Sequence, residues 1–515
     1  MDNRTWDLLI VGGGINGAGI ARDAVGRGLS VLLVEQDDLA AHTSSASTKL
    51  IHGGLRYLEH YEFRLVSEAL AEREVLLAIA PHLVEPLRFV LPHEPHLRPK
   101  WMIRAGLFLY DHLGGRRTLL RSGAVALDRE GYGAGLKPSF RRGFVYSDAR
   151  VDDARLVVAN ALDARARGAD IRTRTRFAGA RNVDGVWQAT LAPRGGSSTE
   201  VHARVLVNAA GPWVASVVGD IAGARAEANV RHVKGSHIVV PRVHTADHAY
   251  ILQNADRRIV FVIPYQDRYS LIGTTDIAVD SCAAPAIDAF ETEYLLAIAN
   301  AYLARSLDAT DIVWSYSGVR PLYDDGASDP SAVTRDYVLK TEIVGGANGG
   351  GRVVSAADAA APSASTGAAP LLSIYGGKIT TYRRLAEHAL ADLARFLPGM
   401  KPAWTSRATL PGGDLPRGDR AAWLADLVRR YPQLDPGLLR AVAQRHGTRA
   451  TAVLGDAKRV ADLGEDFGAS LTERELQWLV AEEWACDADD VLWRRTKCGL
   501  PMSAAQRERV AERLA

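Results

Sequence analysis

Three glycines and one acidic residue near the start of the chain have the types and spacing that bind a dinucleotide. Gly12, Gly14 and Gly17 form G-x-G-x-x-G after the apolar run 7–11, and Glu35 ends the next apolar run. The first glycine permits a tight turn, the second lets backbone N–H groups approach a pyrophosphate, and the third lets helix and strand pack closely. An acid at the position of Glu35 accepts hydrogen bonds from ribose hydroxyls and would repel a 2′-phosphate. The pattern therefore predicts NAD or FAD and disfavours NADP.

The segments around these residues have the hydrophobic patterns needed to position them. Residues 7–11 and 30–35 are short apolar runs typical of buried parallel strands, and residues 16–27 are predicted to form a helix that stops at Gly28. Strand, helix, strand and acid follow in register, as in a βαβ unit. A glycine-rich turn without a ligand is the competing interpretation, and this register argues against it.

Three further segments favour FAD as the dinucleotide. Residues 43–54 follow the ribose-binding strand and supply hydroxyls, a lysine and a glycine pair. Residues 208–213 and 376–381 contain two more glycine turns, and the second leads into a helix through Lys378. A helix N-terminus with a lysine can stabilise the negative charge of a reduced flavin. The residues predicted to bind FAD are Gly12, Gly14, Ile15, Asn16, Gly17, Glu35, Gln36, Ser44, Ser45, Thr48, Lys49, Leu50, His52, Gly53, Gly54, Ala210, Gly211, Trp213, Gly377, Lys378 and Thr380.

Five longer motifs resemble those of the aerobic, FAD-dependent glycerol-3-phosphate dehydrogenase family. They are residues 44–59, 234–237, 272–276, 316–322 and 376–383, and the resemblance continues through 493–497. It implies a fold like that of the glycine oxidase and D-amino-acid oxidase flavoproteins, with an added C-terminal helical domain. It also implies oxidation of sn-glycerol 3-phosphate to dihydroxyacetone phosphate, by hydride transfer from the substrate C2 to N5 of FAD. Membrane quinone would then take the electrons, in the catabolism of glycerol and glycerophospholipids.

The phosphate of such a substrate needs several cations, and the planar arginine side chain matches its oxygens best. The resemblance places Arg56, Arg320 and Arg335 in the substrate pocket, and we assign Arg56 and Arg320 to catalysis as well. The other residues predicted to bind the substrate are Tyr57, Asp276, Lys378 and Thr380.

Proton removal from the substrate hydroxyl needs a base, and histidine titrates in the useful range. His237, before the apolar run 238–240, is the first candidate, although a histidine that merely caps a strand fits the same pattern. His52 is the second candidate, and covalent attachment of the flavin to it stays open. No cluster of histidine, cysteine and acidic residues in the sequence asks for a metal, so we expect no metal site.

The order of patterns along the chain predicts an α/β protein with a Rossmann-like FAD-binding domain, an antiparallel-sheet substrate domain and a C-terminal all-helical domain. A loop and a helical region are expected from the ribose-binding strand to about residue 90, β-branched strands over 230–320, and a flexible Gly/Ala/Ser-rich insertion at 344–370. The predicted divisions are 1–90, 146–225 and 371–400 for FAD binding, 91–145 for a substrate- and membrane-facing part, 226–340 for the substrate domain, 341–370 for the flexible insertion and 401–515 for the helical domain.

Charge and hydropathy limit the partners of the chain. The net charge of +2 gives no reason to expect nucleic-acid binding, and the chain lacks the run of about 18 apolar residues that a membrane span needs. Residues 97–121 interleave aromatic and basic side chains, which suits a helix lying on an anionic membrane surface. A core-packed helix with a basic solvent face is the alternative. We expect a cytoplasmic protein attached peripherally to the inner face of the cell membrane, and a homodimer stays open.

Three other functions fit parts of the same pattern. A glycerol-3-phosphate oxidase would pass the electrons to oxygen. An amine or amino-acid oxidase on the same fold would need fewer cations in its pocket. A flavin-binding protein without catalytic activity would keep the glycine motif alone.

Overall fold

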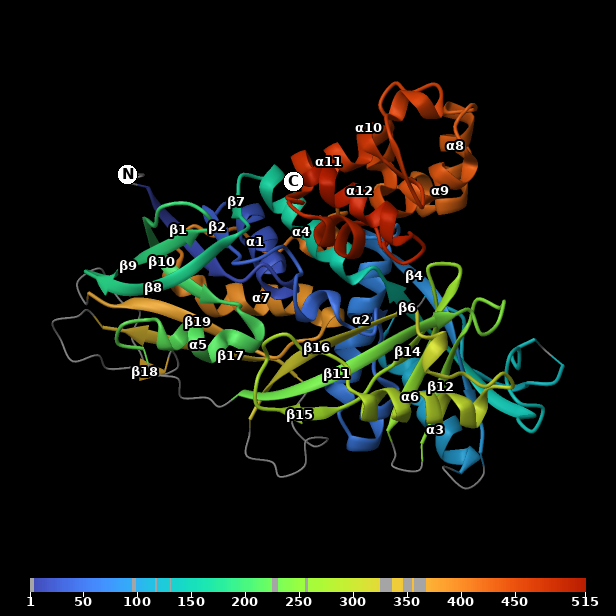
Figure 1. The fold of residues 1–515 in the computed structure, drawn as a ribbon. Coiled ribbons are helices and arrows are strands. Elements are labelled where there is room, and N and C mark those ends of the chain that lie inside the picture. The colour runs from blue at the N-terminus through green and yellow to red at the C-terminus, as the bar shows by residue number, and fades with distance from the viewer. Residues whose placement is uncertain are drawn as a thin grey trace.

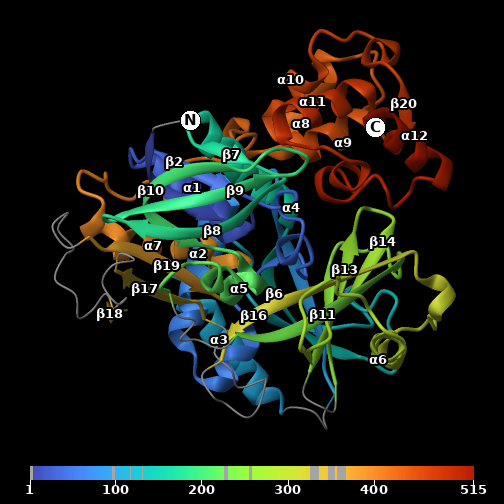
Figure 2. The same ribbon diagram turned by 60° about the vertical axis from the view of Figure 1, so that its left-hand side comes forward.

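The computed structural model describes residues 4–94, 99–115, 118–129, 131–224, 230–254, 258–324, 336–345, 354–355 and 367–515. Two large sheets with their helices form the body of the molecule, and a helical domain projects from one end of it (Figure 1, Figure 2). These three parts confirm the predicted fold class.

The first sheet has parallel strands at its centre and carries the glycine motif. Its main path runs in the order β18-β17-β19-β10-β1-β2-β7, in which β17 pairs antiparallel with both β18 and β19 and the other pairs are parallel. These strands are β1 (Thr5–Val11), β2 (Val31–Val34), β7 (Asp170–Arg172), β10 (Thr199–Asn208), β17 (Val338–Val344), β18 (Val354–Ser355) and β19 (Ala369–Tyr375).

Both faces of this sheet are covered, which explains why the central stretches 8–11, 31–34 and 205–207 are apolar. On one face, Leu8 and Ile10 pack against helices α1 (Ile15–Gly26), α4 (Asp153–Ala166) and α7 (Tyr382–Leu393). On the other face, β1 residues pack with the antiparallel strands β8 (Thr175–Val183) and β9 (Val186–Pro193) and with helix α5 (Val214–Gly219). The predicted strand 7–11, helix 16–27 and strand 30–35 all lie in this layer within two residues of the observed bounds.

The second sheet is antiparallel except where β12 pairs with β4. Its path is β15-β11-β14-β13-β12-β4-β6-β3, with β16 added beside β11 and β5 beside β6. Helices α2 (Phe63–Ile79) and α3 (Lys100–Leu113) cover one face and α6 (Ala289–Tyr302) covers the other. The strands are β3 (Leu50–Ile51), β4 (Val84–Pro92), β5 (Gly123–Ala126), β6 (Arg142–Val151), β11 (Val230–Pro241), β12 (Ala249–Gln253), β13 (Ile259–Tyr265), β14 (Tyr269–Gly273), β15 (Ile277–Val279) and β16 (Trp314–Tyr323).

Three segments differ from the sequence predictions. Residues 84–90, predicted as helical, form β4, because Leu87, Phe89 and Leu91 pack on the second sheet's core at the two-residue spacing of a strand. The predicted boundary at 145/146 falls inside β6, and the boundary at 340/341 falls inside β17. Strand pairing decides both, since β6 joins the second sheet and β17 joins the first. Of the predicted insertion 341–370, residues 346–353 and 356–366 lie outside the described residues.

The C-terminal domain is mostly helical, as predicted. It is built around two apolar clusters, one under α8 to α10 and one under α11 and α12. A short hairpin of β20 (Asp466–Gly468) and β21 (Leu471–Thr472) joins the two halves. The helices are α8 (Arg420–Arg430), α9 (Pro436–His446), α10 (Ala450–Leu454), α11 (Glu473–Glu483), a π-helix (Asp490–Arg495) and α12 (Ala504–Leu514).

Two buried histidines in the loop that joins β11 and β12 predict that the protein loses stability in acid. His244 and His248 lie between β11 and β12 with ring centroids 4.9 Å apart. Burial is the main reason that the pKa of each falls from 6.5 to about 4. The unfolded chain takes up these protons near pH 6.5 and the folded chain only near pH 4, so the free energy of unfolding should decrease as the pH falls through this window.

Urea unfolding at about pH 7 and about pH 4.5 should show a loss of a few kcal/mol from this pair. The double variant His244→Gln/His248→Gln should show a smaller loss between the two pH values. An equal loss in the variant would assign the acid sensitivity to other groups.

Candidate active site

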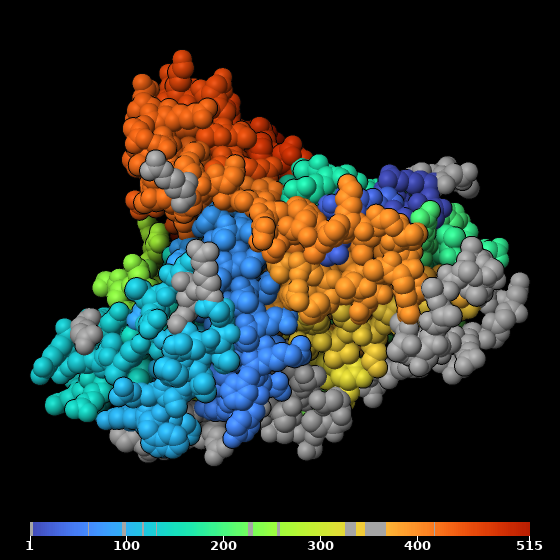
Figure 3. Space-filling model, turned by 180° about the vertical axis from the view of Figure 1, so that it is seen from behind, coloured from blue at the N-terminus to red at the C-terminus, as the bar shows by residue number. Residues whose placement is uncertain are grey.

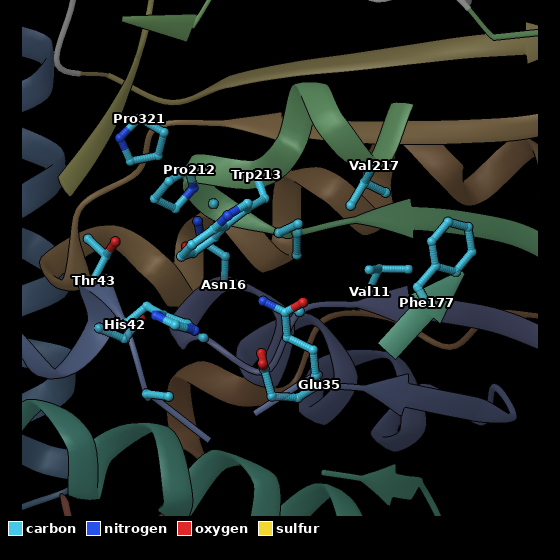
Figure 4. Close-up of a pocket in the computed structure, with 18 of the residues that line it drawn as sticks. Val11, Asn16, Glu35, His42, Thr43, Phe177, Pro212, Trp213, Val217 and Pro321 are labelled. Atoms are coloured by element: carbon cyan, nitrogen blue, oxygen red, sulfur yellow. The ribbon is translucent and has the colours of Figure 1, made fainter. Parts of the chain in front are cut away.

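An elongated cavity lies at the carboxyl ends of β1 and β2, where the glycine motif was predicted to bind a nucleotide (Figure 4). Val11, Phe177 and Val217 form an apolar end. Glu35 lies between this end and the pair His42 and Trp213, whose ring centroids are 4.5 Å apart. An apolar slot, an acid and a glycine loop in this order fit an adenine, its ribose and a pyrophosphate.

Glu35 holds the glycine loop as well as facing the cavity. Its carboxylate accepts hydrogen bonds from the backbone N–H groups of Gly13 at 2.7 Å and Asp37 at 2.9 Å. Burial raises the pKa of Glu35, and the two backbone donors and the nearby His42 oppose that rise. Glu35 thus ties the loop after β1 to the loop after β2 before any ligand binds.

Gly12 and Gly14 lie in positions where a side chain would be crowded by the protein, and without one their backbone can approach a ligand closely. A Cβ atom on Gly12 would lie 2.5 Å from the carbonyl oxygen of Ala209, and one on Gly14 would lie 3.0 Å from Ser44 Oγ. Asn16 donates from Nδ2 to the Gly376 carbonyl at 3.2 Å, and its buried Oδ1 has no hydrogen-bond partner among the described residues. The cavity therefore offers an unused acceptor and close backbone approach, and it fits FAD.

Most of the predicted cofactor residues lie in the wall of this cavity. The loops after β1, β2, β10 and β19 meet there, although they come from distant parts of the chain. The predicted residues that line it are Gly12, Gly14, Ile15, Asn16, Glu35, Gln36, Ser44, Ala210, Gly211, Trp213 and Gly377.

Lys49, which is predicted to contact the cofactor, has its ammonium group in an ion pair within the protein. Its ammonium group is buried and contacts the Asp153 carboxylate at 2.8 Å and the Ser45 carbonyl at 2.8 Å. An ammonium group in this environment needs an anionic partner. Asp153 also accepts from Ser47 Oγ at 2.7 Å, so the pair fixes the loop that leads into β3.

A second group of predicted residues gathers where the helical turn 55–60 meets the start of α7. Lys378 Nζ lies 3.7 Å from the centre of the Tyr57 ring. Thr380 Oγ1 accepts from the backbone N–H of His52 at 3.2 Å. Burial and the charge of Lys378 lower the pKa of His52 to about 3, so this imidazole is neutral. Arg56 is half-buried on the same turn, after Gly54, whose φ of +75° lets the turn begin there.

A third group surrounds Arg320 near the end of β16. Its Nη2 contacts Asp276 at 2.8 Å and donates to the Thr275 carbonyl at 3.1 Å. Arg320 is one-third exposed, so its guanidinium is held in place and remains accessible. Pro321, the next residue, lines the nucleotide cavity together with Gly377. Arg320 therefore stands beside the cofactor cavity, whereas Arg335 lies outside the described residues.

His237 is buried beside this third group. Its Nε2 is 3.0 Å from Thr48 Oγ1, its ring stacks on Tyr316 at 4.8 Å, and its Nδ1 has no hydrogen-bond partner among the described residues. Burial, Lys49 and Arg320 hold the pKa of His237 well below 6.5. The histidine is neutral and packed in the interior. A histidine that merely caps a strand would not need to be buried in this way.

Glu291 is a site residue that the sequence interpretation missed. It is fully buried on α6 and accepts from Ser236 Oγ at 2.8 Å, from Thr275 Oγ1 at 2.7 Å and from Lys234 Nζ at 2.8 Å. Glu291 thereby connects the part of β11 before His237 with the turn at Thr275, which contacts Arg320. The spacing Asp288-x-x-Glu291 marks a helix start in the sequence, but nothing local links that helix to the site.

Gly235 lies directly under the Arg320 guanidinium, which makes it a sensitive position. A Cβ atom there would lie 2.7 Å from Arg320 Nη2 and 2.7 Å from Thr274 Oγ1. We expect Gly235→Ala to displace the guanidinium and to raise KM roughly tenfold, with unchanged flavin content. Steady-state kinetics would measure this, with Gly219→Ala as control because a Cβ there meets nothing within 4 Å. Equal kinetics for both variants would contradict the assignment.

Comparisons with known proteins agree with this arrangement. Residues 7–357 match the FAD dependent oxidoreductase family, and residues 403–515 match the C-terminal domain of alpha-glycerophosphate oxidase. The chain is 53% identical to the aerobic glycerol-3-phosphate dehydrogenase of Escherichia coli, over 99% of this chain and 97% of that protein. It is 47% identical to the D-erythritol 1-phosphate dehydrogenase of Brucella abortus, also over 99% and 97%.

A solved structure gives the same result for the fold. The X-ray structure of the glycerol-3-phosphate dehydrogenase from Bacillus halodurans complexed with FAD is 26% identical, with a TM-score of 0.73, and covers 100% of this chain and 94% of that one. The glycine motif, the cavity at the strand ends and these relatives lead to one conclusion. The chain belongs to the FAD-dependent oxidoreductases and, within them, to the glycerol-3-phosphate dehydrogenase family.

Proposed function

We propose that this protein oxidises sn-glycerol 3-phosphate to dihydroxyacetone phosphate and passes the electrons to membrane quinone. The observation that carries the substrate assignment is the position of Arg320, which stands beside the cofactor cavity with an accessible guanidinium. Arg56, on the turn before α2, and Lys378, in the turn that leads into α7, add two further cations. A phosphate monoester needs this concentration of positive charge, whereas an amino-acid carboxylate needs less.

The chain's own residues have distinct roles in this proposal. Arg320, Arg56 and Lys378 bind the phosphate, and Asp276 orients Arg320 and accepts from a substrate hydroxyl. FAD, when bound, accepts the hydride from C2. His237 receives the hydroxyl proton, because it is neutral and one ring nitrogen makes no hydrogen bond among the described residues. Burial lowers the pKa of His237 most, and the charges of Lys49 and Arg320 add to this; a phosphate dianion beside Arg320 would offset these charges and make the base stronger.

An anaerobic titration tests the substrate assignment. Addition of sn-glycerol 3-phosphate should bleach the flavin band at ~450 nm completely. D-erythritol 1-phosphate and glycine are the comparison substrates, and faster bleaching by either one would transfer the assignment to that compound. No bleaching by any of them would indicate a flavin-binding protein without this activity.

The electron acceptor is tested separately, after reduction is established. The reduced protein should be reoxidised quickly by a soluble quinone and slowly by oxygen. Peroxide production at the full turnover rate without quinone would make the protein an oxidase.

The proposed membrane contact is helix α3, which lies at the end of the body opposite the C-terminal domain (Figure 1, Figure 3). Helix α3 buries Ile103, Leu107 and Tyr110 but leaves Trp101 72% and Phe108 63% exposed. Met102 and Leu109 of α3 are also exposed, as are Tyr61, Phe63 and Leu120 in neighbouring parts of the sequence.

Helix α3 combines apolar and basic side chains in the manner of a peripheral anchor. Lys100 and Arg104 are exposed on α3, next to Trp101 and Phe108. A core-packed helix with a purely basic solvent face would have its aromatic residues turned inward, and these two are turned outward. None of the helices within the described ranges is long and apolar enough to span a bilayer.

Co-sedimentation with vesicles that contain phosphatidylglycerol tests the membrane proposal. The variant Trp101→Ser/Phe108→Ser should remain in the supernatant while the unaltered protein sediments. Val480→Ser is the control, since Val480 is an exposed apolar residue of α11 in the C-terminal domain. Undiminished sedimentation of the double variant would place the anchor elsewhere.

A further inference from the structure

The C-terminal domain grips the loop after β2 through a buried ion-pair cluster. Asp38 is fully buried in this loop and accepts from Arg494 Nε at 2.6 Å. Arg495 donates to the same carboxylate from Nη1 at 2.6 Å and from Nη2 at 2.7 Å. A two-pronged guanidinium contact fixes both position and orientation of a carboxylate.

The other side of the same loop forms part of the nucleotide cavity. Glu35 and Gln36 precede Asp38, and Ala40 and His42 follow it, and all four line the cavity. Asp38 points away from them into the C-terminal domain. The C-terminal domain thus fixes this loop on the side opposite the cavity, at the position where Glu35 must face a ribose.

A second contact supports the neighbouring wall. Arg174 donates to Asp490 of the C-terminal domain at 2.8 Å, and its backbone N–H donates to the Asp37 carbonyl at 2.9 Å. Thr175, the next residue, lines the cavity and donates from its N–H to the Glu35 carbonyl at 2.7 Å. Arg494 contacts Asp38 directly and also contacts Asp490, the partner of Arg174. One arginine thus connects the loop after β2 with the segment around Thr175.

We propose that residues 486–495 are a cofactor clamp, which couples docking of the C-terminal domain to binding of the adenosine half of FAD. Coupling of this kind is reciprocal, so FAD should stabilise the docked domain by the same factor by which the docked domain strengthens FAD binding. The proposal gives the C-terminal domain a role in binding the cofactor. It rests on FAD as cofactor and is independent of the identity of the substrate.

The test compares two arginines that both join the body to the C-terminal domain. Arg494→Gln removes the contacts with Asp38 and Asp490, whereas Arg165→Gln removes a contact between α4 and Glu482 that does not touch the loop. Each full-length apoprotein is titrated with FAD, and the quenching of FAD fluorescence gives the dissociation constant. We expect a dissociation constant at least roughly tenfold higher for Arg494→Gln and within about twofold of the unaltered protein for Arg165→Gln.

Two further measurements complete the experiment. At saturating FAD, KM and kcat for glycerol 3-phosphate should be unchanged in Arg494→Gln, because Arg494 touches neither ligand cavity nor substrate residues. Unchanged FAD affinity in Arg494→Gln, or an equal loss in Arg165→Gln, would overturn the clamp. If Arg494→Gln does not fold, Arg494→Lys replaces it. Lysine keeps the charge but has one nitrogen in place of the two that contact Asp38 and Asp490, and the same thresholds for the FAD dissociation constant apply.

Discussion

Replacement of Arg320 by glutamine should lower kcat/KM roughly a thousandfold while the protein keeps its flavin. A charge-assisted hydrogen bond contributes about 1.5–3 kcal/mol, and Arg320 is placed to make two of them to a phosphate. The loss has a second source, since Asp276 would be left as an uncompensated anion next to the bound phosphate. KM should therefore rise strongly, and kcat should fall because the substrate is no longer held against the flavin.

Steady-state kinetics and the flavin absorption spectrum measure the two parts of this prediction. Arg320→Lys should recover part of the loss, because it restores the charge without the planar fork. Arg242→Gln is the matched control, since Arg242 follows the far end of β11 and holds a loop through Asp247 and backbone carbonyls. A flavin-free Arg320→Gln protein, or an equal kinetic loss in the control, would show that Arg320 is structural.

Gly17→Ala should yield a protein without bound FAD. A Cβ atom at this position would lie 1.9 Å from the carbonyl oxygen of Gly12, which belongs to the backbone of the glycine loop and has no room to move. The start of α1 must then separate from β1, and the N–H groups that face the pyrophosphate move with it. The purified protein should therefore lack the flavin absorption band at ~450 nm completely.

Gly106→Ala provides the matched control for this change. Gly106 also lies within a helix, but a Cβ there meets nothing within 4 Å. Alanine in place of glycine within a helix typically stabilises by about 0.5–1 kcal/mol, so this variant should hold FAD normally and melt no lower than the unaltered protein. A flavin-replete Gly17→Ala protein would refute the close-packing argument.

The part of the fold around the glycine motif could be predicted because its determinants are local. The strand 7–11, the helix after it and the acid at position 35 each follow from short patterns of apolar, small and acidic residues. Strand β4 was missed because the helical interpretation was continued past Pro81, although a proline there ends the helix and separates it from the strand. The membership of β17 in the first sheet depends on its pairing with β19, and no pattern within 338–344 specifies that partner.

The candidate site shows the same division between local and distant determinants. The cavity-lining glycines and Glu35 were predictable from their spacing. The local sequence around Lys49 suits a phosphate contact, but its ammonium group pairs with Asp153, a residue distant in the sequence. The contacts of Glu291 and the pairing of Asp38 with Arg495, 457 residues apart, exist only in the folded chain. Burial decides these ion pairs, and burial at such separations is a property of the whole fold.

The nucleotide cavity is assembled from segments that lie far apart in the chain, which determines when it can first exist in a cell. Asn16 and Gly376, whose hydrogen bond closes its wall, are 360 residues apart. Translation proceeds at about 5–20 residues per second, so roughly 20–70 s pass between the synthesis of the two residues. During that interval β1 lacks α7 above it and the sheet lacks β19, which leaves an apolar strand edge open to aggregation. The complete wall of the FAD cavity can therefore form only after the chain has been synthesised past Gly377.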